Sequence, residues 1–191
     1  MLFYFTATGN SLYAAKQLDD NRVSIAQAIH RKEKKYAADK IGIVCPVFGH
    51  EVPELVREFL SEAEFKTDYF YLVLTYGSRH GGAAKLAQRV LEEMGIHPSY
   101  INVVWMADNF LPGFDMDEEK RMDKKVDAQL SRIREDIENR VQFISPVTDA
   151  DRQTHRAYLE RAAQMPKEAF ANLYRITDAC IGCGICAKVC P

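Results

Sequence analysis

Four short runs dominated by apolar residues recur along the chain, at residues 2–5, 41–45, 70–74 and 100–106. Runs of this length, in which hydrophobic positions are continuous rather than alternating, indicate strands buried on both faces of a parallel sheet. A weaker strand candidate lies around residues 23–25. The pattern therefore predicts five strands, of which four are strongly indicated.

Helical spacing of apolar residues fills the segments between these strands. A first helical stretch extends through Leu18, Pro53 marks the start of a second helix, and Gly95 marks the end of a third. The apolar faces of the second and third helices comprise Leu55, Val56, Phe59, Leu60, Leu86, Val90, Leu91 and Met94. Alternating strands and helices of these lengths predict βαβ units and an α/β fold with a parallel sheet.

The pattern changes after residue 109. Residues 116–144 contain no strand signal, but apolar residues recur there every three or four positions: Val126, Leu130, Ile133, Ile137, Val141 and Ile144. This spacing predicts one long, highly charged helix that packs against the sheet. Residues 145–175 are polar and contain Pro146 and Pro166, which predicts a connector with one or two short helices.

The chain ends in four closely spaced cysteines, Cys180, Cys183, Cys186 and Cys190, followed by Pro191. The spacing C-x2-C-x2-C-x3-C-P is the one with which bacterial ferredoxins hold iron–sulfur clusters. Soft thiolates suit iron in a cluster, and short gaps let three cysteines surround one small metal core. A structural zinc site is the alternative, although zinc ligand pairs are usually separated by a longer loop.

The fourth cysteine of such a run ligates the other cluster in two-cluster ferredoxins. Cys190 is therefore poorly placed to complete the cluster of the first three cysteines. We expect the natural protein to continue with a second cysteine run, and the 4Fe-4S cluster of this chain to be absent, partial or labile. One stable four-iron cluster per chain would contradict that expectation.

The loop after the first strand, residues 6–11, is a candidate anion site. It carries three hydroxyl side chains, one glycine and one amide, and no charged side chain. A glycine turn that opens a helix exposes backbone N–H groups, and the helix dipole favours an anion there. The loop lacks the lysine of a triphosphate-binding P-loop, so a phosphate monoester is the natural guest. A simple helix cap would explain Ser11 and Thr8 but not Gly9 or Asn10.

The pattern Thr-x-Thr-Gly-Asn-Ser after an N-terminal strand resembles the phosphate loop of flavodoxins, which bind FMN. Two further loops, residues 46–50 and 75–81, follow the next strong strands and resemble the flavin-ring loops of that family. The resemblance implies a flavodoxin-like open sheet with strand order 2-1-3-4-5 over residues 1–144. With a connector at 145–175 and a ferredoxin-type segment at 176–191, the whole chain resembles the EFR1 family, flavodoxin-like domains fused to a bacterial-type ferredoxin domain.

The resemblance also implies which residues hold the flavin. In the first loop these are Thr6, Ala7, Thr8, Gly9, Asn10 and Ser11; in the other two they are Pro46, Val47, Phe48, Gly49, Thr75, Tyr76, Gly77 and Gly81. The resemblance places Phe48 and Tyr76 near the isoalloxazine ring, and the backbone of Gly49 near flavin N5. The alternative is that both aromatic side chains only hold their own loops.

The third loop departs from the flavodoxin pattern. It lacks acidic residues and carries Arg79 and His80, which suit an anionic reduced flavin or an acidic substrate, or are simply solvated. His50 and Glu51, beside the second loop, are best explained as residues of an ordinary surface loop. Proton transfer at the flavin is the alternative, because the pKa of histidine suits that task. Cys45, at the end of a strand, is best explained as a small core residue.

Composition and charge limit the partners and the cellular location that the sequence predicts. The 191 residues carry a formal net charge of −2, with 47% hydrophobic residues. Nothing in this balance indicates nucleic acid or an anionic membrane surface as a partner. Four of the five cysteines lie in the terminal run, so the sequence does not indicate a disulfide framework. Reduced thiols indicate a cytoplasmic protein. The first apolar run lacks the features of a signal peptide, and no apolar stretch is long enough to span a membrane.

These features favour a soluble cytoplasmic electron-transfer flavoprotein that exchanges electrons between FMN and 4Fe-4S clusters. Since a flavin accepts two electrons and a cluster one, such a protein links two-electron and one-electron redox partner proteins. An electron carrier is favoured over an enzyme with its own substrate. The alternatives are a flavin-dependent reductase of a small molecule, fed by the cluster, and a non-redox interaction module with zinc-bound cysteines.

Overall fold

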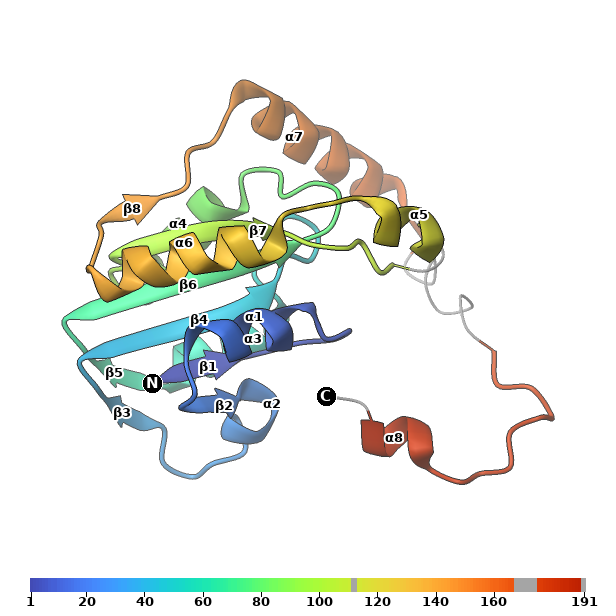
Figure 1. Ribbon diagram of the computed structural model, residues 1–191, viewed down its shortest axis with the longest axis horizontal. Coiled ribbons are helices and arrows are strands. Elements are labelled where there is room, and N and C mark those ends of the chain that lie inside the picture. Colours follow the sequence, from blue (N-terminus) through green and yellow to red (C-terminus); the bar gives the residue numbers. More distant parts are fainter. Residues whose placement is uncertain (111–112, 167–174, 190–191) are drawn as a thin grey trace.

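A six-stranded sheet with the order β2-β1-β4-β6-β7-β8 runs through the molecule (Figure 1). The computed structural model describes residues 1–110, 113–166 and 175–189. All neighbouring strands of the sheet are parallel. The strands are β1 (Leu2–Tyr4), β2 (Arg22–Ser24), β4 (Lys40–Pro46), β6 (Tyr69–Tyr76), β7 (Tyr100–Trp105) and β8 (Phe143–Ile144). Without β8, their order is the predicted 2-1-3-4-5 arrangement of a flavodoxin-like fold.

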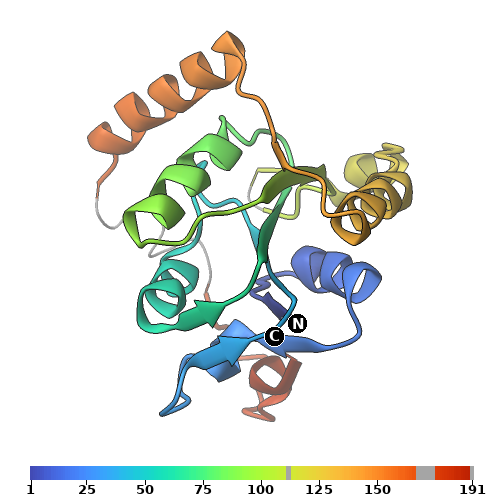
Figure 2. The same ribbon diagram turned by 90° about the vertical axis from the view of Figure 1, so that its left-hand side faces the viewer.

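Helices cover both faces of the sheet (Figure 2). On one face, α1 (Asn10–Leu18) and α6 (Val126–Glu138) bury side chains against the alternate strand residues Leu2, Val44, Tyr71, Val73, Tyr100 and Val104. On the other face, α2 (Ile25–Ala28), α3 (Glu54–Glu62) and α4 (Ala83–Glu93) pack on Phe3, Ile41, Ile43, Leu72, Leu74 and Ile101. Coverage on both faces explains why the strands are continuously apolar.

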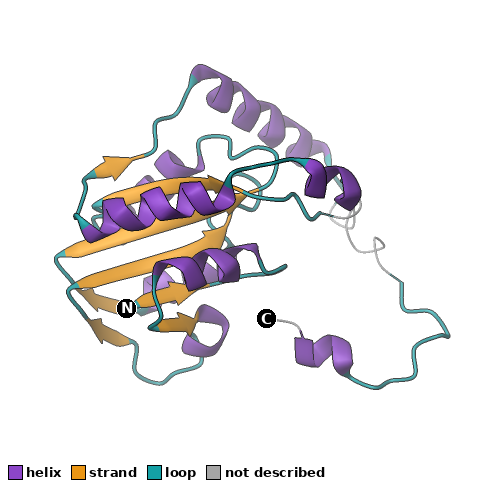
Figure 3. Cartoon of the chain, viewed as in Figure 1, coloured by secondary structure: helices purple, strands orange, loops and turns teal. Residues whose placement is uncertain are grey.

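A second, two-stranded parallel sheet lies outside the main one (Figure 3). It consists of β3 (Lys35–Ala37) and β5 (Glu64–Lys66). Tyr36 and Phe65, one from each strand, stack with ring centroids 5.9 Å apart and contact the aromatic core around Phe3. The sequence pattern did not predict this sheet, because each strand has only one inward-facing apolar side chain.

The single long helix predicted for residues 116–144 is wrong. The chain forms α5 (Met116–Arg121), breaks at Lys125 with a φ of 52°, and continues as α6. A second left-handed residue, Arg140 with a φ of 55°, follows the end of α6. Val141 and Ile144 therefore lie outside the helix, and Ile144 is in β8. The edge of β7 provides the alternative hydrogen bonds: Phe143 N–H donates to Ser99 O and Ser145 N–H to Ile101 O.

The connector also differs from its prediction. It contains α7 (Asp149–Gln164), a helix of 16 residues rather than one or two short ones. Its start is fixed by a capping box in which Thr148 and Asp151 satisfy each other's backbone N–H groups. Residues 167–174 lie outside the described part, and α8 (Ile185–Val189) follows. No helix in the described ranges is both long and apolar enough to cross a membrane.

Candidate functional site

Four loops meet at the carboxyl edge of the sheet and line one cavity of about 1050 Å³. They follow β1, β4, β6 and β7, so the parallel strands themselves bring them together. Twelve of the fourteen predicted cofactor residues line this cavity: Thr6, Ala7, Thr8, Asn10, Ser11, Pro46, Val47, Phe48, Gly49, Thr75, Tyr76 and Gly77. Gly9 and Gly81 do not line it; they shape its loops.

The first loop turns tightly into α1. Gly9 has a φ of 102°, a conformation that glycine adopts without strain, and its N–H donates to Thr6 Oγ1 over 3.0 Å. The N–H groups in the first turn of any helix lack an intrahelical acceptor, and among the described residues no side chain caps these. The Thr8 side chain is exposed beside them. This end of the cavity thus offers uncharged hydrogen-bond donors at a helix N-terminus.

Two hydrogen bonds tie the first loop to its neighbours. The Ser11 and Thr75 hydroxyls are both buried and lie 2.8 Å apart. Asn10 Nδ2 donates to Ala107 O over 2.8 Å, which joins α1 to the loop after β7. The donor set, namely backbone N–H groups and hydroxyls without lysine or arginine, fits a phosphate monoester held mainly by neutral hydrogen bonds.

The second loop is a tight turn that presents Phe48. The backbone N–H and C=O groups of Phe48 and Glu51 bond to each other over 3.0 Å, and both central residues have positive φ, 57° at Gly49 and 70° at His50. These are the features of a type I′ turn. The Phe48 ring is 50% exposed and packs edge-on against Phe5. An exposed ring at a cavity mouth can stack on a planar ligand.

The third loop places Tyr76 in the cavity and His80 behind it. The two rings meet edge-on with centroids 4.9 Å apart. Burial and, next, the negative charge of Asp151 raise the pKa of the Tyr76 hydroxyl, so it stays protonated. Gly81 lies under the His50 ring, where a Cβ would collide with it. Gly81 therefore permits the burial of His50, and the interpretation of His50 as a surface-loop residue is wrong.

The fourth loop was not among the predicted site residues. It contributes Ala107, Asp108, Asn109 and Phe110, and Phe114 lies beyond it. Asp108 packs so closely on Gly77 that any Cβ at Gly77 would collide with its carboxylate. It supplies the acidic group that the third loop lacks. The sequence could have predicted this loop as part of the site, because the loop follows the last predicted strand at the carboxyl edge of the sheet.

A buried ion pair holds the fourth loop in place. Glu119 Oε2 accepts the Asp108 N–H over 2.7 Å and the Lys124 ammonium over 2.6 Å. Lys124 Nζ also donates to Met106 O over 2.9 Å and lies over the Trp105 ring. The Lys124 ammonium, followed by the Asp108 N–H, lowers the pKa of the Glu119 carboxyl. Glu119 and Lys124 are thus positioning residues for the Asp108 wall.

Helix α7, which lies in the predicted connector, forms a further wall. Thr154, Tyr158 and Arg161 line the cavity. The Tyr158 hydroxyl lies against Gly49, where a Cβ would collide with it. The positive φ of Gly49 and its lack of a Cβ therefore let the helix approach the turn.

Three contacts hold α7 against the second and third loops. His155 Nδ1 lies 3.3 Å from His50 Nδ1, and the Tyr158 ring lies 4.9 Å from the His50 ring. His80 Nε2 lies 3.6 Å from Asp151 Oδ1. Burial lowers the pKa of His50, and His155, His80, Arg79 and Arg161 add to this effect in that order. Because its pKa is lowered, the His50 ring at the α7 contact is neutral at pH 7.

The cysteine run is exposed where the structure describes it. Cys180, Cys183 and Cys186 are free thiols at the surface, and Cys190 lies outside the described residues. In the described ranges, no three histidine, cysteine or acidic side chains are close enough together to hold a metal ion. Cys45 is buried in the core, as predicted, and burial raises the pKa of its thiol.

Comparison with known proteins adds one family match. The family model of the 4Fe-4S binding domain (Fer4) matches residues 173–191, which contain the cysteine run. This segment carries an iron–sulfur binding motif. A search of curated proteins found no match.

Three solved structures resemble the chain at low identity. The Trp repressor binding protein of Bacillus subtilis is 9% identical over 62% of this chain and 91% of its own, with a TM-score of 0.41. A protein assigned as a flavoprotein from Bacteroides uniformis is 16% identical over 56% and 90%, with a TM-score of 0.39. Rubredoxin oxygen:oxidoreductase of Desulfovibrio gigas is 13% identical over 69% and 35%, with a TM-score of 0.42. Likenesses this weak carry no argument, and the fold assignment rests on the strand order.

Proposed function

We propose that this chain is an electron-transfer flavoprotein, in which residues 1–144 bind FMN and the C-terminal cysteines bind a 4Fe-4S cluster. One observation carries the proposal. At the carboxyl edge of the sheet, one cavity has a neutral anion-binding loop at one end and aromatic side chains along its middle. The same chain contains the motif matched by the 4Fe-4S binding domain.

Each part of the cavity has a distinct task in this proposal. The first loop binds the FMN phosphate through the N–H groups of α1 and the hydroxyls beside them. Phe48, Tyr76 and Phe110 exclude water and orient the planar ring system. Gly49 brings the backbone close to the ring edge, since it has no side chain. Thr75 links the phosphate end to the ring end through its hydrogen bond with Ser11.

The chemistry comes from the cofactors, and the protein binds and orients them. A bound flavin accepts two electrons and passes them on singly. Cys180, Cys183 and Cys186, with Cys190, would supply the thiolates for iron. We further propose membership of the EFR1 family, redox partner proteins on both sides and a cytoplasmic location, which the free thiols support.

A flavin-dependent reductase of a small molecule is the second candidate. The size of the cavity favours it, because about 1050 Å³ reaches the upper end of the range typical of small-molecule sites, about 300–1,000 Å³.

The test is an anaerobic absorbance spectrum of the purified chain, with iron, zinc and acid-labile sulfide assayed on the same sample. Bound flavin together with iron and sulfide supports the electron carrier. Flavin without iron restricts the function to a flavodoxin-like carrier. Zinc without flavin refutes the proposal and favours the interaction module.

A further inference from the structure

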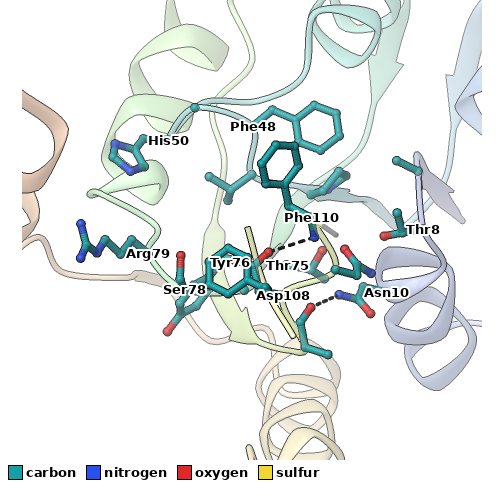
Figure 4. A pocket seen from close by; sticks show the side chains of 18 of the residues that line it. Thr8, Asn10, Phe48, His50, Thr75, Tyr76, Ser78, Arg79, Asp108 and Phe110 are labelled. Carbon is teal, nitrogen blue, oxygen red and sulfur yellow. Dashed lines mark hydrogen bonds between the residues drawn. The ribbon is translucent and has the colours of Figure 1, made fainter. Parts of the chain in front are cut away.

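The two ends of the cavity differ in charge (Figure 4). Thr8 and Asn10 lie at one end, where the lining is neutral. Arg79 and His50 lie at the opposite end, and Phe48, Phe110 and Tyr76 lie between them. A flavin whose phosphate occupies the first loop therefore points its ring system toward the arginine end.

A second arginine reaches this end from another element. Arg161 of α7 lines the same cavity as Arg79 of the third loop. His50, whose pKa the charges of both arginines lower, lines the same cavity, and both arginine side chains are exposed. Within the described residues, neither arginine has a carboxylate within 4.0 Å. Asp108, the acidic residue of the lining, lies toward the middle of the cavity, beside Gly77.

Two arginine side chains on the lining of one aromatic cavity, without an ion pair among the described residues, form a suitable site for an organic anion. Arginine binds a carboxylate through two parallel N–H···O bonds, which fixes its orientation as well as its charge. The Tyr158 and Phe110 side chains of the same lining provide apolar walls for the body of such a ligand. Inorganic phosphate would leave those walls unused.

We propose that Arg79 and Arg161 form a subsite for the carboxylate of a small organic acid, bound in the flavin cavity beyond the ring. The inference rests on the proposed function for the position of the flavin. With this subsite, the cavity binds a second, acidic ligand in contact with the cofactor. Both arginines belong to the lining of a cavity rather than to a flat patch, which favours a small molecule over the acidic surface of a partner protein.

The experiment titrates benzoate against the flavin-loaded chain and follows the flavin difference spectrum, with isothermal titration calorimetry as a second readout. Benzamide, which has the same shape without charge, is the matched ligand control. We expect saturable benzoate binding, at least tenfold weaker benzamide binding, and weak binding of inorganic phosphate. Equal binding of benzoate and benzamide, or no binding of benzoate, overturns the proposal.

Three variants locate the subsite. Arg79→Gln and Arg161→Gln each remove one guanidinium and are expected to weaken benzoate binding by about tenfold or more, because a hydrogen bond to a charged group is lost. Arg156→Gln removes an exposed arginine of α7 that does not line the cavity, and it should leave binding unchanged. An equal effect of all three variants would mean a general charge effect and would overturn the assignment.

The two hypotheses fail separately. If the chain binds FMN but the arginine variants bind benzoate with the same affinity as the parent, only the subsite is wrong. Binding the acidic surface of a partner protein then becomes the better role for these residues. If the chain binds no flavin, the proposed function is wrong. Calorimetry on the flavin-free chain with the same ligands and variants then still decides whether the arginine subsite exists.

Discussion

At the residue scale, Gly49 links the cavity to helix α7. Its φ of 57° is unfavourable for any residue with a Cβ, and that Cβ would also collide with Tyr158. Gly95 is a matched position, because its φ of 76° is similar but nothing lies within 4 Å of its missing Cβ. The pair separates backbone strain from the contact with the helix.

We therefore predict that Gly95→Ala costs about 1–2 kcal/mol of unfolding free energy, the price of the left-handed backbone alone. Gly49→Ala should cost about 1 kcal/mol more, since the α7 contact is disturbed as well. In a Tyr158→Ala background the two glycine variants should become equal. Urea unfolding measures all of these, and a persistent difference in that background would contradict the role given to Tyr158.

The pair of Glu119 and Lys124 gives a second prediction at this scale. Both side chains are almost fully buried, so removing one leaves an uncompensated charge. Lys124→Met should destabilise the fold by about 3–5 kcal/mol, whereas Glu119→Gln combined with Lys124→Met should cost less than the single lysine change. The measurement is a double-mutant cycle by urea unfolding. Strictly additive effects would show that the pair contributes no coupling.

At the scale of elements, α7 lies against the body through polar and aromatic side chains and buries no residue fully. His50 has a lowered pKa at this contact, so the docked helix disfavours its protonation. The resulting stability is fully present above the unperturbed histidine pKa of about 6.5 and is lost as pH falls through that value toward the lowered one. We predict that α7 docks well at neutral pH and loosens in mild acid.

Amide hydrogen exchange in α7 measures this, with His50→Gln as the reference at each pH so that intrinsic exchange rates cancel. The parent chain should lose protection in α7 relative to the variant as pH falls from 7.5 to about 5.5. The amides of α4 serve as the internal control and should not change. Equal protection in parent and variant throughout would rule out His50 as the titrating group.

The elements differ in whether the sequence pattern could predict them. The buried strands could be predicted because an uninterrupted run of five residues without a polar side chain, as at Ile41–Cys45, is rarely exposed to water in a chain of this polarity. Three loops of the site followed from those strands and from the resemblance. The strand β8 could not be predicted: Ile144, one of its two residues, continues a helical apolar spacing, and only the free edge of β7 decides the conformation of the pair.

The α7 wall was unpredictable for a different reason. Its contacts with the cavity are made by isolated polar and aromatic side chains, such as His155 and Tyr158, which have no periodic pattern. Their partners lie about a hundred residues earlier; His50 and His155, for example, are 105 positions apart. A contact of this kind depends on tertiary geometry, and no local spacing indicates it.

At the scale of the whole molecule, flavin binding and folding are coupled, because the cavity exists only when four strands and α7 are assembled. A ligand that binds the folded chain alone stabilises it by about 2.7 kcal/mol at a hundredfold excess over its Kd. We predict that FMN raises the thermal midpoint more than riboflavin does, since riboflavin lacks the phosphate that the first loop binds. Equal shifts would contradict a phosphate site there.

The Asn10→Asp variant sharpens this prediction. It places a negative charge beside the phosphate while keeping the side-chain shape, so it should abolish the advantage of FMN over riboflavin without reducing the riboflavin shift. The lost bond to Ala107 lowers stability equally in both titrations and therefore cancels. Asn139→Asp makes the same charge change at an exposed position after α6 and should preserve the advantage. If both variants preserve the advantage of FMN, the phosphate does not bind at the first loop, and the arginine subsite loses the flavin orientation on which it depends.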